Sequence, residues 1–316
     1  MIAAPIPGPI PVTVIGGFLG AGKTTLVNHV LRASSRRYAV LVNDFGALNV
    51  DSGLIAGQDG AVVSLANGCV CCSIGPDLGG TLATIATRRP APEHILIEAS
   101  GVSDPWRIAQ LVKLEEGVAL DAVLVLVDAA AFPEQLADRY LTDTLERQLA
   151  RADLVVLNKT DLATPGLAAD AVRRIRGDVG LVEVAHAALP DALLGGVLLG
   201  DSPPCAASRF HAGPPEHGFR TWLWDDPAPF DRAALAAVLD GLPPSVLRLK
   251  GMCSTDRDAA PHLLQLAGRR WSLTPVLAGS TPGLVMIGTS VLPAADALAA
   301  LFRTALLTKM AVPFPA

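Results

Sequence analysis

Short apolar runs alternate with turns and helical stretches through the first 190 residues of the chain. Each run is rich in Val, Ile and Leu, and the runs span residues 11–17, 39–44, 94–100, 122–130 and 152–161. Strands that are apolar on both sides of the pleat are typical of a parallel sheet covered by helices on both faces. The pattern therefore predicts an α/β domain over residues 1–190, with its functional residues at the carboxyl ends of the strands.

The pattern changes after residue 190. Residues 191–217 are rich in Gly, Pro, Ala and Ser, which predicts a linker. Strands are then predicted at 219–224, 246–251, 269–274 and 283–288, and helices at 231–241 and 293–307, with Asp231 as the N-cap of the first helix. Because strands and helices do not alternate strictly here, we expect a smaller α+β domain over residues 218–316.

The segment GGFLGAGKTT, residues 16–25, follows the first strand and opens a helix. It fits the pattern G-x-x-x-x-G-K-[ST], in which backbone N–H groups surround phosphate oxygens. Lys23 supplies a positive charge for the β and γ phosphates, and the Thr24 hydroxyl is a ligand for Mg²⁺. The sequence therefore predicts a P-loop NTPase domain, and the residues expected to bind the phosphates are Gly17, Gly20, Ala21, Gly22, Lys23, Thr24 and Thr25.

The segment NKTD, residues 158–161, ends the fifth predicted strand. The Asp161 carboxylate can accept hydrogen bonds from N1 and the exocyclic N2 of guanine, a donor pair that adenine lacks. We expect Asn158 to brace this loop and the stem of Lys159 to cover the base. The predicted nucleotide is therefore GTP.

Two further segments lie at strand ends between these motifs. In EASG (98–101), Glu98 can hold a metal-bound water and the Gly101 N–H can contact a γ-phosphate, which predicts a switch loop. In NDFG (43–46), Asp44 is either a metal ligand or water-orienting group, or an ordinary turn aspartate. The catalytic candidates are Lys23, Asp44 and Glu98. No glutamine follows Gly101 and no arginine finger is evident, so we expect slow intrinsic hydrolysis.

Three of the five cysteines in the chain gather in NGCVCCS, residues 67–73, as Cys69, Cys71 and Cys72. Thiolates are ligands for Zn²⁺ and other soft metals. A closed tetrahedral zinc site needs four ligands, and this loop offers at most three. The incomplete set favours a metal that is passed on. The alternatives are a structural metal completed by a distant residue, a redox pair, or three inert buried thiols. Cys205 and Cys253 are expected to be ordinary small apolar residues.

Together these segments resemble the CobW-like family of metallochaperone GTPases. The resemblance rests on GGFLGAGKTT, VNDFG, NGCVCCS, LIEASGVSDP and NKTD, and in the second domain on LRLKG, RRW and VMIG. It covers nearly the whole chain. It implies binding of Mg²⁺ and GTP, a metal site at Cys69, Cys71 and Cys72, and transfer of a divalent metal, zinc or cobalt, to a client protein.

The chain also departs from that family pattern. The second strand of the family usually ends with a glutamate where this chain has Asp44, and Ala47 replaces a frequent acidic residue. Some members carry a histidine tract, whereas here only His211 and His217 lie in the linker, where they are expected to be solvated. The identity of the metal stays open.

Two other functions remain as alternatives: a P-loop kinase for a small molecule, and a GTP-gated protein-association module in which zinc is structural. The formal net charge of −5 and the absence of a basic stripe argue against nucleic acid as a partner. No apolar run reaches the roughly 20 residues of a transmembrane helix, and no signal peptide is evident, so a cytoplasmic location is expected. The oligomeric state and the client are not predicted.

Overall fold

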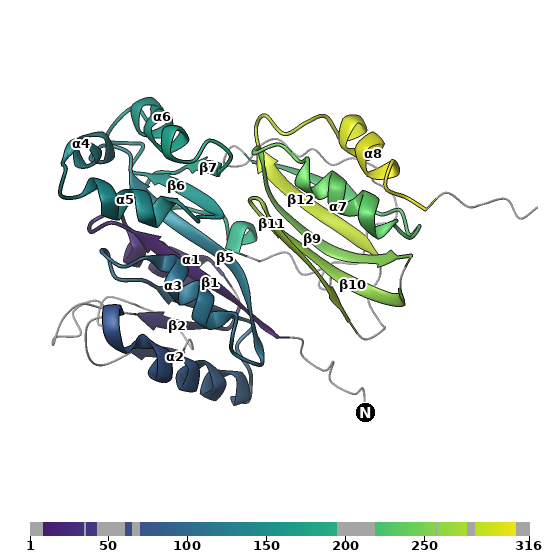
Figure 1. The fold of residues 1–316 in the computed structure, drawn as a ribbon, viewed down its shortest axis with the longest axis horizontal. Helices are drawn as coiled ribbons and strands as arrows, with labels where there is room; N and C mark the ends of the chain where they lie inside the picture. Colours follow the sequence, from purple (N-terminus) through teal and green to yellow (C-terminus); the bar gives the residue numbers. More distant parts are fainter. Residues whose placement is uncertain are drawn as a thin grey trace, which may run out of the picture. The chain divides into compact units, whose positions relative to one another are not determined.

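The computed structural model describes residues 9–34, 36–42, 61–64, 70–194, 219–256, 258–276 and 282–307, with the backbone alone described at 61–64, 70–77, 191–192 and 258–260. The chain divides into two compact units, residues 1–196 and 197–316. Figure 1 shows a sheet with helices in each unit.

The first unit is built on a seven-stranded sheet in the order β3-β2-β4-β1-β5-β6-β7, and its neighbouring strands pair in parallel. The strands are β1 Ile10–Gly17, β2 Tyr38–Val42, β3 Ala61–Ser64, β4 His94–Glu98, β5 Val118–Asp128, β6 Leu154–Asn158 and β7 Gly180–Glu183. In a parallel sheet all strands end at the same edge, so the loops that follow them meet there. The predicted α/β class with a parallel sheet is confirmed.

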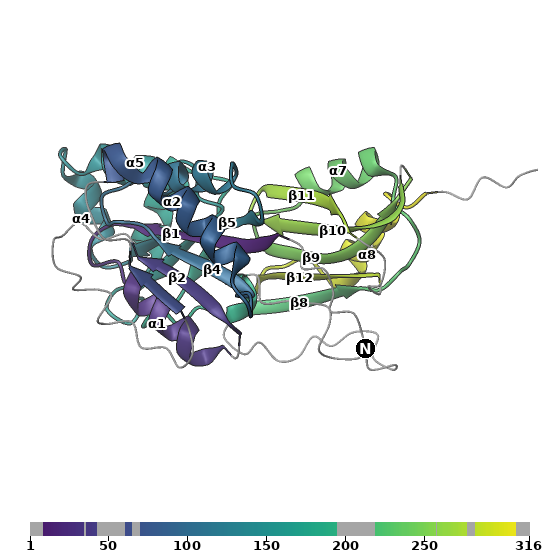
Figure 2. The ribbon, with the colours of Figure 1, turned by 90° about the horizontal axis from the view of Figure 1, so that it is seen from below.

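Helices cover both faces of this sheet, with α1 on one face and α2, α3 and α5 on the other (Figure 2). The helices are α1 Lys23–Ala33, α2 Val70–Thr87, α3 Pro105–Val112, α4 Phe132–Ala137, α5 Thr142–Leu149 and α6 Gly166–Ile175, followed by the 3₁₀ helix η2 Asp191–Leu194. Alternate residues of a strand point to opposite faces. Val12 and Val14 of β1 accordingly join the core beneath α2 and α3, while Leu26 and Val27 of α1 are buried on the other side.

Three elements of the first unit differ from the sequence prediction. The short strands β3 and β7, four residues each, were not predicted. The cysteine motif was predicted to lie in a loop, but α2 begins at Val70, so Cys71 and Cys72 occupy the first turn of a helix. The helix was missed because its sequence contains Gly75, Pro76 and two further glycines, which are poor helix formers.

The second unit has a five-stranded antiparallel sheet in the order β11-β10-β9-β12-β8, with two helices. Its elements are β8 Phe219–Trp224, α7 Arg232–Asp240, β9 Val246–Thr255, β10 Asp258–Ala267, β11 Arg270–Pro275, β12 Gly283–Thr289 and α8 Ala295–Arg303. Asp231 caps α7, because its Oδ1 accepts a hydrogen bond from the Ala234 N–H at 2.7 Å. The smaller α+β unit is confirmed, although β10 was not predicted.

One apolar cluster joins both helices of the second unit to one face of its sheet. Its aromatic centre consists of Trp222 and Trp224 of β8, Phe302 of α8, and Phe230, which precedes α7. The ring centroids of Phe302 and Trp222 lie 5.2 Å apart, and those of Phe302 and Trp224 lie 5.9 Å apart.

None of the helices in the described part of the chain combines the length and apolar character that crossing a bilayer requires.

Candidate nucleotide and metal site

The phosphate loop, residues 16–25, connects the end of β1 to the start of α1. Lys23 is the first residue of α1 and is 8% exposed; its Nζ donates hydrogen bonds to the carbonyl oxygens of Gly17 at 3.0 Å and Phe18 at 3.2 Å. The ammonium group therefore lies over the turn that would surround the phosphates. Ala21 is buried, whereas Gly20 and Thr25 are exposed. The positive end of α1 adds to the attraction for an anion at this position.

Thr24 links the phosphate loop to β4. Its Oγ1 donates a hydrogen bond to Oε1 of Glu98 at 2.8 Å, and Glu98 is the last residue of β4 and is buried. A hydroxyl and a carboxylate are the oxygen donors that Mg²⁺ prefers. The chemistry of these two side chains fits a magnesium ion, which Thr24 would ligate while Glu98 would hold a metal-bound water.

Asn158, the last residue of β6, joins the phosphate loop to the segment after β7. Its Nδ2 donates to the Ala21 carbonyl at 2.9 Å, and its Oδ1 accepts from the Ala187 N–H at 2.7 Å. Gly22 fits against this amide: a Cβ at Gly22 would lie 2.3 Å from Asn158 Nδ2, and the φ angle of Gly22 is +102°. A side chain at position 22 would therefore break the contact between the two loops.

The rest of the NKTD segment forms one ion pair, through Lys159, and one close approach of a carboxylate to an imidazole, through Asp161. The Nζ of Lys159 lies 2.7 Å from Oδ2 of Asp128, the last residue of β5, and Lys159 adopts a φ of +62°. This pair holds the lysine stem in one direction. A side chain that is expected to cover the base of the nucleotide would need such a fixed direction. The Asp161 Oδ2 lies 3.9 Å from Nε2 of His186. His186 and Ala187 are consecutive non-glycine residues with φ angles of +53° and +55°, a rare backbone conformation that the bond to Asn158 helps to hold.

The loop of residues 98–105 runs from β4 to α3. Ser103 donates hydrogen bonds to the Ser100 carbonyl from both its N–H, at 3.1 Å, and its hydroxyl, at 2.9 Å. Asp104 then caps α3 by accepting from the Trp106 N–H at 2.9 Å. At Gly101 a Cβ would lie 2.5 Å from Leu19 Cδ2 and 2.9 Å from the Leu19 nitrogen. The loop therefore packs directly on the phosphate loop.

Several predicted residues are placed only in part. Asp44 and Cys69 lie outside the described residues, as do His211 and His217, and for Cys71 and Cys72 the backbone alone is described. Where side chains are described, no cluster of three or more His, Cys, Asp or Glu could hold a metal. The candidate metal ligands therefore stay as the sequence analysis gives them.

Strand register places the last residue of β3 at the edge of the sheet where the nucleotide residues lie. Val42 pairs with Ser64 on one side and with Glu98 on the other, and Glu98 pairs with Ile15, two residues before Gly17. Ser64, the last residue of β3, therefore lies in the same row across the sheet as Glu98, with Val42 between them. The helix α2 begins six residues after Ser64.

Sequence reasoning missed three features of the site: Asp128, the 184–188 segment and Gln148. Asp128 follows a buried apolar run, and this position at a strand end is a signal that could have identified it. Ala187 contributes only a backbone group, and Gln148 reaches the 98–105 loop from α5, donating from Nε2 to the carbonyls of Gly101 and Ser103. Neither has a local pattern in the sequence.

The chain matches two family models. Residues 11–180 match the nucleotide-binding domain described as CobW/HypB/UreG, and residues 219–306 match the cobalamin synthesis protein cobW C-terminal domain. The first match covers more than half of the chain, and the two matches fall one in each unit.

Curated relatives align along most of the chain. It is 30% identical to the zinc chaperone CobW of Sinorhizobium sp over 83% of this chain and 86% of that protein. It is also 30% identical to the zinc chaperone YjiA of Escherichia coli K12, over 84% of this chain and 88% of that protein. Among solved structures, the Zn(II)-bound YjiA GTPase from E. coli matches with 25% identity and a TM-score of 0.45, over 95% of this chain and all of that chain.

Proposed function

This chain belongs to the CobW family of P-loop GTPases, and on that premise we propose that it is a metallochaperone that binds a divalent transition metal and delivers it to a client protein when GTP is hydrolysed. Zinc is the proposed cargo, because the curated relatives that align along most of the chain are named zinc chaperones. Cobalt is the other metal that the thiol ligands would accept.

The observation that carries the proposal is that Ser64, Val42, Glu98 and Ile15 lie side by side on the four neighbouring strands β3, β2, β4 and β1. It supports a short path between the cysteine motif and the phosphate site, because β1, β4 and β3 end at one edge of the sheet. The chain between Ser64 and α2 spans only residues 65–69. We propose that a change at the γ-phosphate is transmitted along this edge of the sheet to the segment that carries Cys69.

We assign each residue a role on this basis. Lys23 and the phosphate loop bind the β and γ phosphates, Thr24 and Glu98 hold Mg²⁺, and Asp161 reads guanine. When bound, Mg²⁺ neutralises charge on the phosphates. Asp44 is proposed to orient water or to complete a metal site. The thiolates of Cys69, Cys71 and Cys72 bind the cargo metal.

Thermodynamic linkage makes the proposal quantitative. If GTP raises the affinity of the thiolates for zinc by some factor, zinc must raise the affinity of the protein for GTP by the same factor. If GDP lacks this coupling, hydrolysis lowers the zinc affinity by that factor, and the ion can leave for a client. We propose that the client docks on the second unit.

The test is a competitive zinc titration of the protein loaded with a non-hydrolysable GTP analogue, repeated after exchange for GDP. We expect each of Cys69→Ser, Cys71→Ser and Cys72→Ser to lower zinc affinity at least tenfold while phosphate release from GTP continues. Cys205→Ser is the matched control, because it removes one thiol outside the motif, and it should leave zinc affinity unchanged.

Three results would contradict the proposal in different ways. Unaltered zinc affinity in the triple serine variant would remove the metal site. Zinc that binds equally in both nucleotide states would indicate a structural ion and favour the protein-association module. Transfer of phosphate to a small molecule, in place of release as free phosphate, would indicate a kinase.

A further inference from the structure

The side chain of Gln148 ties the 98–105 loop to α5. Gln148 is 3% exposed, and its Nε2 donates hydrogen bonds to the Gly101 carbonyl at 3.1 Å and to the Ser103 carbonyl at 3.0 Å. A primary amide has two N–H groups, so one nitrogen can serve both acceptors. The bonds of Ser103 to Ser100 stay within the loop. The amide of Gln148, by contrast, connects the loop to a separate element.

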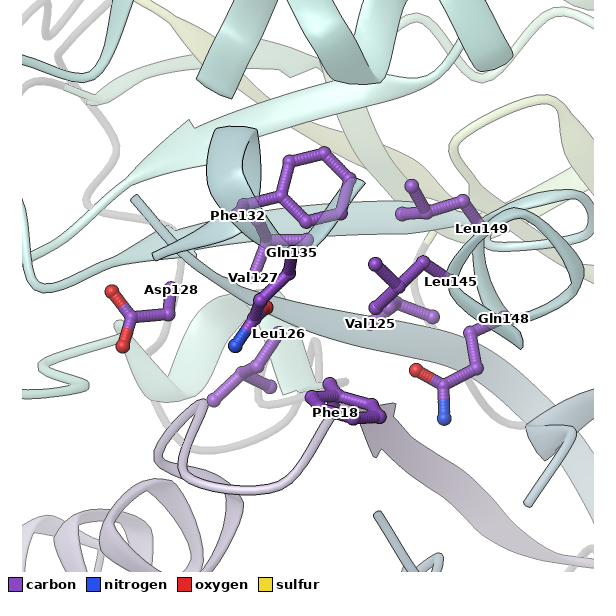
Figure 3. A pocket seen from close by; sticks show the side chains of 10 residues that line it. All are labelled: Phe18, Val125, Leu126, Val127, Asp128, Phe132, Gln135, Leu145, Gln148 and Leu149. Atoms are coloured by element: carbon purple, nitrogen blue, oxygen red, sulfur yellow. The ribbon is translucent and has the colours of Figure 1, made fainter. Parts of the chain in front are cut away.

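The position of Gln148 on α5 is itself fixed by packing. Leu145 and Leu149 on the same helix are buried in the core beneath the sheet. Figure 3 shows Gln148 and Phe18 of the phosphate loop on the lining of one small cavity, which also includes Leu145 and Leu149. The helix therefore faces the same cavity as the phosphate loop while it bonds the 98–105 loop, so it can set the position of one against the other.

The contact at Gly101 shows what the amide holds in place. Leu19 fills the space where a Cβ of Gly101 would lie, so the 98–105 loop rests against the phosphate loop at this residue. Gln148 binds the carbonyl of the same residue. Because the peptide group is planar and trans, fixing the Gly101 carbonyl toward α5 turns the Val102 N–H to the opposite side. The amide thus fixes both the place of Gly101 and the orientation of the peptide that follows it.

The end of the loop is held from the same region of the chain. The guanidinium of Arg151, two residues after α5, lies 5.4 Å from the centroid of the Trp106 ring in the first turn of α3. Cation–π contacts of this kind stabilise by about 0.5–1 kcal/mol at exposed sites. The loop is therefore bound to residues 148–151 at its middle and just after its end.

We infer that Gln148 is a positioning residue that keeps the 98–105 loop ready for the third phosphate, and so makes binding of GTP stronger relative to GDP. The inference rests on the proposed GTPase function and goes beyond it, because it assigns the discrimination between triphosphate and diphosphate to α5. The residue does not touch the nucleotide. It lowers the free energy of ordering a loop that only the γ-phosphate would contact.

The test compares Q148M and Q148E with wild type in binding of fluorescent GDP and of a fluorescent non-hydrolysable GTP analogue. Q148M keeps an unbranched side chain of similar size and removes two hydrogen bonds, one to the buried Gly101 carbonyl and one to the partly buried Ser103 carbonyl. We expect it to weaken binding of the triphosphate analogue by roughly 10- to 30-fold, and to change GDP binding less than twofold. Q148E places a carboxylate against two carbonyl oxygens, so its effect should be larger in the same direction.

Q135E is the matched control, because Gln135 of α4 lines the same cavity and no bond from it to the loop was found. It should leave both affinities unchanged. Equal weakening of GDP and triphosphate binding in Q148M, with its circular dichroism unchanged, would overturn the inference, and so would no weakening at all. A wild-type protein that binds neither guanine nucleotide would instead overturn the proposed function, which separates the two failures.

Discussion

The two units of this chain use their sheets in opposite ways. The strands of the first unit are parallel, so their carboxyl ends meet at one edge, and Glu98, Asp128 and Asn158 are each the last residue of a strand at that edge. Neighbouring strands of the second unit are antiparallel, so their carboxyl ends alternate between two edges. Its sheet face carries an aromatic core. Direction of pairing thus decides which unit can gather polar side chains from distant parts of the sequence.

This difference predicts that substitutions in the two units will separate cleanly. Changes at strand ends of the first unit should alter nucleotide binding with little effect on folding. Changes in the core of the second unit should alter folding with little effect on nucleotide binding.

Asp161→Asn should reverse the base preference of the first unit. The asparagine amide keeps an acceptor for the N1–H of the base but presents a donor where guanine also has one, whereas xanthine has a carbonyl there. We expect the ratio of affinities for GTP and XTP to change by roughly 10⁴-fold, measured with fluorescent analogues of both. Asp170→Asn, an exposed site on α6, is the control. Retained GTP preference in the Asp161 variant would show that the base is read elsewhere.

Phe302→Ala should destabilise the second unit by about 3–5 kcal/mol, because Phe302 is fully buried among Trp222, Trp224 and Phe230. Denaturant unfolding followed by tryptophan fluorescence measures the loss. Leu301→Ala, at the adjacent and exposed position, should cost far less. GTP hydrolysis below the unfolding transition should not change in either variant. A matching loss of hydrolysis would show that the two units are coupled.

The smallest expected effect is the contribution of Cys253 to the free energy of unfolding, and this contribution depends on pH. Burial raises the pKa of the Cys253 thiol from 9.0 to about 11, so the folded state keeps a proton that the unfolded state releases near pH 9. The stabilising contribution of the protonated thiol is therefore complete below pH 9 and declines as the pH rises to about 11. We expect the free energy of unfolding to fall by roughly 2–3 kcal/mol over this range, and Cys253→Val to remove that part of the slope. An identical pH dependence in wild type and variant would refute the assignment.

The sequence predicted those parts of the fold and site that have local signals. The strands of the first unit are uniform apolar runs, and Lys23 and Asp161 lie in motifs whose residues are close in sequence. Asp231 was predicted as an N-cap because the helix that follows it is periodic, and its side chain caps α7.

The features that were missed lack such signals. Pro261 has no N–H for pairing, and the β9–β10 register shifts between Asp258 and His262, so β10 does not follow a simple alternation. Glycines and Pro76 conceal α2. Gln148 acts on a residue 47 positions earlier in the chain, and nothing in its neighbourhood indicates that partner. Contacts between distant segments become visible only when the sheet brings them together.

The single amide of Asn158 has a consequence for how the ligand binds. It holds a carbonyl of the phosphate loop and an N–H of Ala187 at the same time, which fixes the spacing between the two ends of the site when the protein folds. A whole nucleotide then meets both ends at once, and the second contact forms within one molecule. Guanosine and triphosphate supplied as separate molecules forgo that advantage, so the intact covalent chain between base and phosphates is part of what the protein recognises.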